Sequence, residues 1–139
     1  RDLDTTLLEM ADESEDGKLV SELADEKFHR IISQATRNKM IAKVIDDLWY
    51  VRDNSPDVHK AYQAICETDW KARVDEHREI LAALKKRDSH AARAAMHEHF
   101  ARILSKLIAV QEEAQLEAIR RQAQESRERF SLDHLATSA

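Results

Sequence analysis

The chain has 139 residues, with 22 basic and 27 acidic side chains and a formal net charge of −5. This length fits one domain with one core. The acidic balance argues against direct binding of nucleic acid, which needs a basic surface. A single cysteine excludes an internal disulfide. One glycine and one proline leave few places to break a helix, and no apolar run approaches the ~20 residues of a membrane span. We therefore expect an all-α, cytoplasmic protein.

The predicted helices follow one another with short polar breaks between them. Residues 2–11 have the pattern of the end of a helix, and we expect a fragment of a longer protein whose first helix is truncated. Apolar stripes at helical spacing then predict helices over about 19–36, 39–52, 57–66, 69–87 and 89–111. The fold class is thus an antiparallel helical bundle of about six helices. Residues after Gln111 are helix-forming but mostly polar, and 131–139 are predicted to be a flexible tail.

Four polar residues lie on or beside the apolar stripes of three different predicted helices. Asp25 and His29 are four residues apart and share one helix face. His77 lies in the middle of an apolar face, and His99 has apolar neighbours within about 60° around its helix. Taken singly, the Asp25–His29 pair fits a surface pair and His77 fits a hydrogen-bonded core histidine. Together, facing one core, they predict a site for Zn²⁺, Ni²⁺, Fe²⁺ or Mn²⁺.

Three further residues are candidates for binding an anion near that site. Arg52 falls among apolar residues of its helix, where a guanidinium requires an anion such as a ligand carboxylate or a neighbouring acidic side chain. Its stem could equally extend to solvent at the helix end. Asn38 precedes this helix and could cap it. Arg73 lies one turn before His77, where it could face the same cavity or form a surface ion pair.

Three motifs follow one another along the chain. The first is DEKFH at 25–29, followed by ATRN at 35–38. The second lies within 76–88 and consists of Glu-His, then Ile, Ala-Leu and Asp, and the third is AMHEH at 95–99. Each motif alone is short, but the set covers most of residues 3–107. In this order the motifs resemble the FCD ligand-sensing domain of bacterial GntR-type transcription regulators of the FadR subfamily. The resemblance implies an effector-binding and dimerisation domain over residues 1–130.

The resemblance also implies roles for individual residues. The metal ligands of the family fall on Asp25, His29, His77 and His99, with Zn²⁺ or Ni²⁺ as the expected ion and a small organic acid bound beside it. The stretch 49–56, WYVRDNSP, is most similar to the hexuronate-pathway regulators, so a hexuronate is one expected effector. The family's N-terminal winged helix-turn-helix is absent here. We therefore expect a homodimer that contacts DNA only through that missing domain.

Two other functions remain open at this stage. Three histidines and a carboxylate could activate water in a metal-dependent, hydrolase-like enzyme. That enzyme would need a general base, and Glu26, Glu76 and Glu98 adjoin ligands but are predicted to point to other helix faces. The second alternative is a ligand-free helical interaction domain with a hydrogen-bonded polar core. We predict a sensor and not an enzyme.

Overall fold

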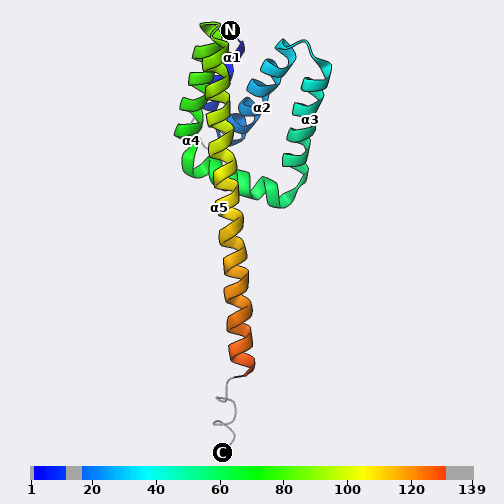
Figure 1. The fold of residues 1–139 in the computed structure, drawn as a ribbon, viewed down its shortest axis with the longest axis vertical. Helices are drawn as coiled ribbons and strands as arrows, with labels where there is room; N and C mark the ends of the chain where they lie inside the picture. Colours follow the sequence, from blue (N-terminus) through cyan, green and yellow to red (C-terminus); the bar gives the residue numbers. More distant parts are fainter. Residues whose placement is uncertain (1, 12–16, 131–139) are drawn as a thin grey trace, which may run out of the picture.

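The computed structural model describes residues 2–11 and 17–130, and for 17–20 and 66–69 it describes the backbone alone. This part of the chain forms five helices and no strands: α1 (Asp2–Met10), α2 (Gly17–Ala35), α3 (Lys39–Asn54), α4 (Pro56–Lys85) and α5 (Ser89–Arg129). The first four helices and the beginning of α5 make a bundle, and the rest of α5 extends away from it (Figure 1). The all-α bundle is confirmed. The predicted tail, 131–139, lies outside the described residues.

Two helices are longer than the sequence pattern predicted. The expected helices over 57–66 and 69–87 are continuous as α4, because no glycine or proline interrupts that stretch. Its path bends in Figure 1, so that its first part crosses one end of the bundle and the remainder runs beside α5. α5 continues to Arg129 because residues after Gln111 are mainly good helix formers. Despite these lengths, no helix in the described part is apolar enough to cross a membrane.

Two loops of similar design reverse the chain direction. In each, an arginine adopts a left-handed backbone conformation, with φ 55° at both Arg37 and Arg87. For residues other than glycine this conformation costs about 1 kcal/mol. The next residue then caps a helix: the Asn38 side chain accepts the backbone N–H of Met40 at 3.0 Å, and the Asp88 side chain accepts that of Ala91 at 2.9 Å. These caps fix where α3 and α5 begin.

The core lies between α1, α2 and α4. It comprises the buried residues Met10, Ala24, Phe28, Val74, Ile80 and Leu81. The predicted apolar stripe of α3 is not part of it, because α3 has no buried residue, and Val44 and Leu48 are 52% and 61% exposed. Ile45 and Trp49, on the adjacent side of α3, are half-buried. The aromatic ring of Phe28 links the core to the polar cluster described next, with its centroid 4.8 Å from that of His77.

Candidate metal centre

The four predicted ligands come together in the interior of the bundle. α2 contributes Asp25 and His29, α4 contributes His77, and α5 contributes His99. All four are buried, with exposed fractions of 0%, 7%, 0% and 1% in that order. Asp25 Oδ1 lies 2.9 Å from His77 Nε2 and 3.4 Å from His29 Nε2. One ring nitrogen from each of the three histidines lies within 4.8 Å of the other two.

A hydrogen bond to the backbone determines which nitrogen of the His77 ring carries the proton. The other nitrogen then presents a lone pair to the buried cluster. Nδ1 lies 2.7 Å from the carbonyl oxygen of Arg73, which can only accept, so Nδ1 carries a proton and donates it. In the neutral ring, Nε2 then presents a lone pair to the Asp25 carboxylate and, at 3.2 Å, to His29 Nε2. The lone pair of His77 and the Asp25 carboxylate repel one another unless a proton or a cation lies between them.

His99 is oriented in the same way by a carboxylate. Its Nδ1 lies 2.9 Å from Glu76 Oε2, and Arg102 Nη2 donates to the same oxygen at 2.8 Å. This leaves His99 Nε2 free to act as a ligand, and carboxylates commonly hold metal-binding histidines like this. The predicted orientation of Glu76 toward another helix face was therefore wrong. The sequence signal was available, since Arg102 lies three residues after His99 and on the same side of α5.

The donor atoms of Asp25, His29 and His77 have the spacing of ligands to one shared divalent ion. Ligand bonds of 2.0–2.2 Å place neighbouring donors roughly 3.0 Å apart in an octahedral site and roughly 3.4 Å apart in a tetrahedral one. The separations among Asp25, His29 and His77 are 2.9, 3.2 and 3.4 Å. Imidazole and carboxylate together suit Zn²⁺ and Ni²⁺. The donor set is therefore of the type and spacing that such an ion requires.

Electrostatics keep the cluster in the protonation states that ligands need. Burial alone would raise the pKa of Asp25, but the neighbouring imidazoles of His29 and His77 outweigh burial and hold the pKa well below its usual value. Burial, with a further contribution from nearby His77, lowers the pKa of His99 to about 4. Burial opposes ionisation of Glu76, yet hydrogen bonds from Arg102 and His99 lower its pKa. At neutral pH the carboxylates are ionised and His99 is neutral.

Two residues of α4 extend the network on the other side of Asp25. The hydroxyl of Tyr62 donates to Asp25 Oδ2 at 2.6 Å. Arg73 Nη1 lies 3.9 Å from the same oxygen, and Nη2 donates to Ser21 Oγ. Arg73 is only 5% exposed, so the alternative of a surface ion pair is wrong. Its Nε and Nη1 are buried with no hydrogen-bond partner, which leaves donors available beside the cluster. Nothing in the sequence pattern singled out Tyr62.

Arg52 lies next to this network and Asn38 does not. The guanidinium of Arg52 stacks over Trp49 at 4.0 Å and Tyr62 at 4.8 Å, and its Nε pairs with Asp53 at 2.9 Å. Its Nη1 is buried without a hydrogen-bond partner. The Trp49 ring in turn lies 6.0 Å from the His29 ring, so Arg52 borders the cluster through two aromatic rings. Asn38 is exposed and its described side-chain bonds are those of a helix cap.

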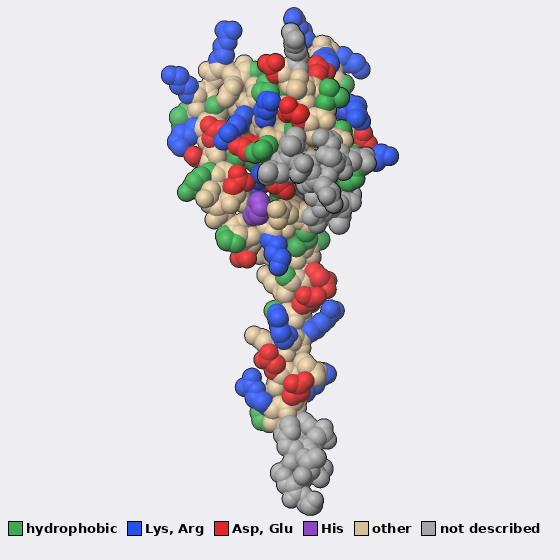
Figure 2. Space-filling view, turned by 180° about the vertical axis from the view of Figure 1, so that it is seen from behind, with side chains coloured by type: hydrophobic (Ala, Val, Ile, Leu, Met, Phe, Trp, Pro, Cys, Tyr) green, Lys and Arg blue, Asp and Glu red, His purple; other side chains and the backbone are tan. Residues whose placement is uncertain are grey.

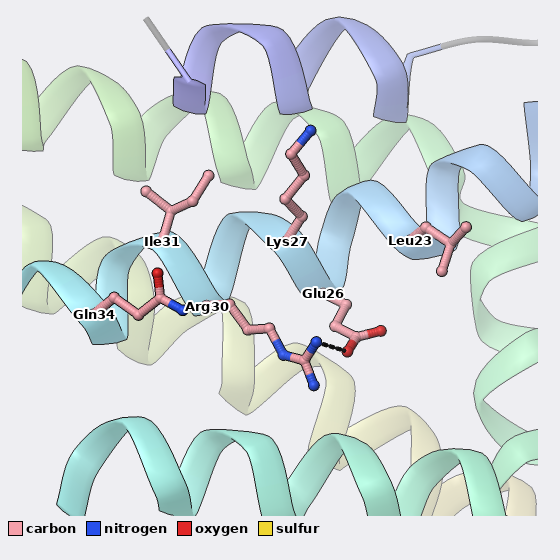
Figure 3. Close-up of a pocket in the computed structure, with 6 residues that line it drawn as sticks. All are labelled: Leu23, Glu26, Lys27, Arg30, Ile31 and Gln34. Atoms are coloured by element: carbon pink, nitrogen blue, oxygen red, sulfur yellow. Dashed lines mark ion pairs between the residues drawn. The ribbon is translucent and has the colours of Figure 1, made fainter. Parts of the chain in front are cut away.

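A shallow groove on α2 is separate from the cluster. It has a volume of about 270 Å³ and is lined by Leu23, Glu26, Lys27, Arg30, Ile31 and Gln34. Figure 3 shows the ion pair of 2.8 Å between Arg30 and Glu26 in this groove. Arg30 also lies 2.9 Å from Asp46 of α3, so it ties α3 to α2. The groove contains none of the four predicted ligands, and we assign it a structural role.

An all-α bundle with a buried histidine–carboxylate cluster is the class of ligand-sensing domain that the motifs implied. A family model described as the FCD domain matches residues 1–102, a range that includes all four cluster residues. The chain belongs to the FCD domain family.

Three curated relatives extend this assignment. The chain is 33% identical to the Uxu operon transcriptional regulator of Escherichia coli (strain K12) over 92 residues, which are 63% of this chain and 35% of that protein. It is 31% identical to the Uxu operon regulator of Haemophilus influenzae over 85 residues, 60% of this chain and 32% of that protein. It is 33% identical to the Exu regulon transcriptional regulator of Escherichia coli (strain K12) over 75 residues, 54% of this chain and 29% of that protein.

These relatives are regulators and not enzymes, in agreement with the prediction of a regulatory domain. The chain spans about a third of the length of the curated relatives it matches. No solved structure matches the chain.

Proposed function

We propose that residues 1–130 are the effector-sensing and dimerisation domain of a transcription regulator, and that Asp25, His29, His77 and His99 hold a divalent ion, Zn²⁺ or Ni²⁺. The observation that carries the metal site is the close approach of atoms that can all act as metal ligands. Asp25 Oδ1, His29 Nε2 and His77 Nε2 lie 2.9–3.4 Å apart in a buried space. A cation shared by the three would stabilise the buried carboxylate and the lone pair of His77 that faces it.

The effector in this proposal is a small organic acid bound beside the ion. An ion held by four protein ligands in six-coordinate geometry has two positions left for a carboxylate or hydroxyl of the effector. Arg73 and Arg52 support this assignment, because each has buried N–H groups with no hydrogen-bond partner. A carboxylate or hydroxyl would satisfy these donors, and guanidinium groups favour such partners. Asn38 stays a predicted effector contact, although its capping bonds give no support for that role.

A hexuronate is the proposed effector class. The stretch 49–56 resembles the hexuronate-pathway regulators, and the relatives are named as regulators of the Uxu operon and the Exu regulon. Trp49 and Arg52 of that stretch are the two residues that border the cluster. DNA binding would belong to an N-terminal domain outside this chain, and the sensing domain would act as a homodimer. Effector binding changes DNA affinity only if one arrangement of the dimer binds the effector more tightly than the other.

Metal content tests the site directly. Protein purified without a nickel column is analysed by mass spectrometry of its metals, and His77→Ala is compared with His97→Ala, a substitution at an exposed histidine of α5. We expect close to one equivalent of Zn²⁺ or Ni²⁺ in the wild type and in His97→Ala, and a large loss in His77→Ala. Equal, negligible metal in all three proteins would rule out the metal site.

Calorimetry tests the effector separately. Galacturonate, glucuronate and fructuronate are titrated into metal-loaded protein, with lactate as a smaller hydroxy acid. We expect one uronate to bind and Arg73→Lys to weaken it, since lysine lacks the planar pair of donors. Binding of lactate alone would replace hexuronate with a smaller acid, and no binding by any uronate would contradict the hexuronate proposal while leaving the metal result intact.

A further inference from the structure

The second half of α5 is a helix without a partner in the described part of the chain. Residues 111–130 lie beyond the part of α5 that runs beside α4, and they stand clear of the bundle in Figure 1. All of these residues are exposed except Ala118, which is half-buried. They also lie outside the range that matches the FCD family, residues 1–102. The role of this stalk, as we call residues 111–130, is therefore independent of the sensing site.

The stalk has a narrow apolar stripe with the spacing of a coiled coil. Leu116, Ile119, Ala123 and Phe130 are separated by three, four and seven residues, which places them on one side of the helix. Leu116, Ile119 and Phe130 are 47%, 61% and 82% exposed. Side-chain pairs along the helix, such as Gln124 with Glu128 at 2.8 Å, stabilise it only weakly. The stripe is an apolar surface that another helix can cover.

Charge along the stalk indicates which helix that is. Its first part carries only acidic charges, at Glu112, Glu113 and Glu117. Its later part has a basic excess, with four arginines, at 120, 121, 127 and 129, against Glu125 and Glu128. Figure 2 shows acidic and basic side chains along this helix. An identical helix running in the opposite direction brings the acidic part of each copy against the basic part of the other. We infer that the stalk pairs with the stalk of a second copy of this chain as an antiparallel coiled coil.

One alignment of the two helices brings together the largest apolar residues at the centre of the stripe and one pair of opposite charges beside them. Leu116 of each copy packs against Ile119 of the other, which makes two equivalent apolar contacts at the centre. The same alignment places Glu113, which flanks the stripe, opposite Arg120 of the second copy, again twice. Within one chain these two side chains are 3.6 Å apart, so both already lie on the same side of the helix.

A parallel arrangement lacks this complementarity. There, the positions that flank the stripe would bring Gln115 opposite Arg120 and Gln122 opposite Arg127, and neither contact joins opposite charges. Charge at the flanking positions selects orientation and partner in coiled coils. The antiparallel pair is therefore favoured, and it links two sensing domains at opposite ends of a rod.

Charge reversal in separate copies tests the pairing. Glu113→Arg and Arg120→Glu each place like charges opposite one another in a pair of identical copies, so each variant alone should self-associate at least about tenfold more weakly than the wild type. Mixed together, they restore both attractions between unlike copies. Light scattering and sedimentation equilibrium of the full chain should show association of the mixture at wild-type strength. Arg121 lies on the side of the helix opposite the stripe. Arg121→Glu is therefore the matched control and should associate like the wild type.

The outcomes separate the stalk from any dimerisation through the bundle. If the bundle also forms a dimer, the charge variants still form that dimer. They lose only the larger assemblies that the stalk makes from it. The double variant Leu116→Gln/Ile119→Gln should lose the same further association with unchanged thermal unfolding of the bundle. An unchanged mass in this double variant, or no recovery when the two charge variants are mixed, would overturn the pairing. Neither result would bear on metal or effector binding.

Discussion

Replacing Tyr62 with phenylalanine tests the polar network around Asp25 with the removal of one atom. The Tyr62 hydroxyl donates to Asp25 Oδ2 at 2.6 Å. Asp25 is fully buried, and its pKa lies well below the usual value because the neighbouring His29 and His77 outweigh burial. Tyr62→Phe leaves the ring in place and removes one donor to a buried carboxylate. Hydrogen bonds to charged groups contribute about 1.5–3 kcal/mol, so we expect a loss of about 2 kcal/mol of unfolding free energy.

The measurements are urea unfolding and thermal unfolding in the presence of a chelator, both followed by circular dichroism. A loss of 2 kcal/mol corresponds to a decrease in Tm of roughly 8 °C for a domain of this size. Tyr50→Phe is the control, because Tyr50 lies on α3 with 67% of its surface exposed and should change stability by less than about 0.5 kcal/mol. Equal stabilities of Tyr62→Phe and Tyr50→Phe would refute the reasoning that the hydroxyl stabilises the buried charge.

Three further predictions concern the cluster and the first turn of α3. Glu76→Gln should weaken metal binding by about 10–100-fold in a competition assay with a chromophoric chelator, because the carboxylate orients His99; Glu98→Gln, at an exposed position, should bind like the wild type. Because the pKa of His99 falls from 6.5 to about 4 on folding, the unfolded chain binds more protons between these values. Stability of metal-free protein should therefore decrease by about 3 kcal/mol as the pH is lowered from 6.5 to 4. An equally steep decrease in His99→Gln would contradict that assignment. Asn38→Ala should cost about 1 kcal/mol through loss of the cap, and unchanged uronate binding in the same variant would remove Asn38 from the predicted effector contacts.

Local patterns were enough to predict the helices and the identity of the cluster residues. The periodicity of apolar residues indicates which side of each helix faces inward, and Asp25, His29, His77 and His99 all lie on those sides. The prediction was less successful where a helix is only partly covered. The apolar stripe of α3 looks like a core stripe in the sequence, yet Val44 and Leu48 are exposed because α3 contacts α2 and α4 with the side that carries Trp49.

The sequence by itself therefore determined the all-α class, the cap at Asn38 and the set of candidate ligands, because each of these depends on neighbours within one or two helical turns. Only the tertiary structure decided which partners complete the cluster. Glu76 and Arg102 orient His99 across α4 and α5, and Tyr62 reaches Asp25 over 37 residues of chain. It also showed Arg73 to be buried beside Asp25 and not on the surface. Contacts of this kind depend on the packing of one helix against another, which the spacing of residues within a single helix does not encode.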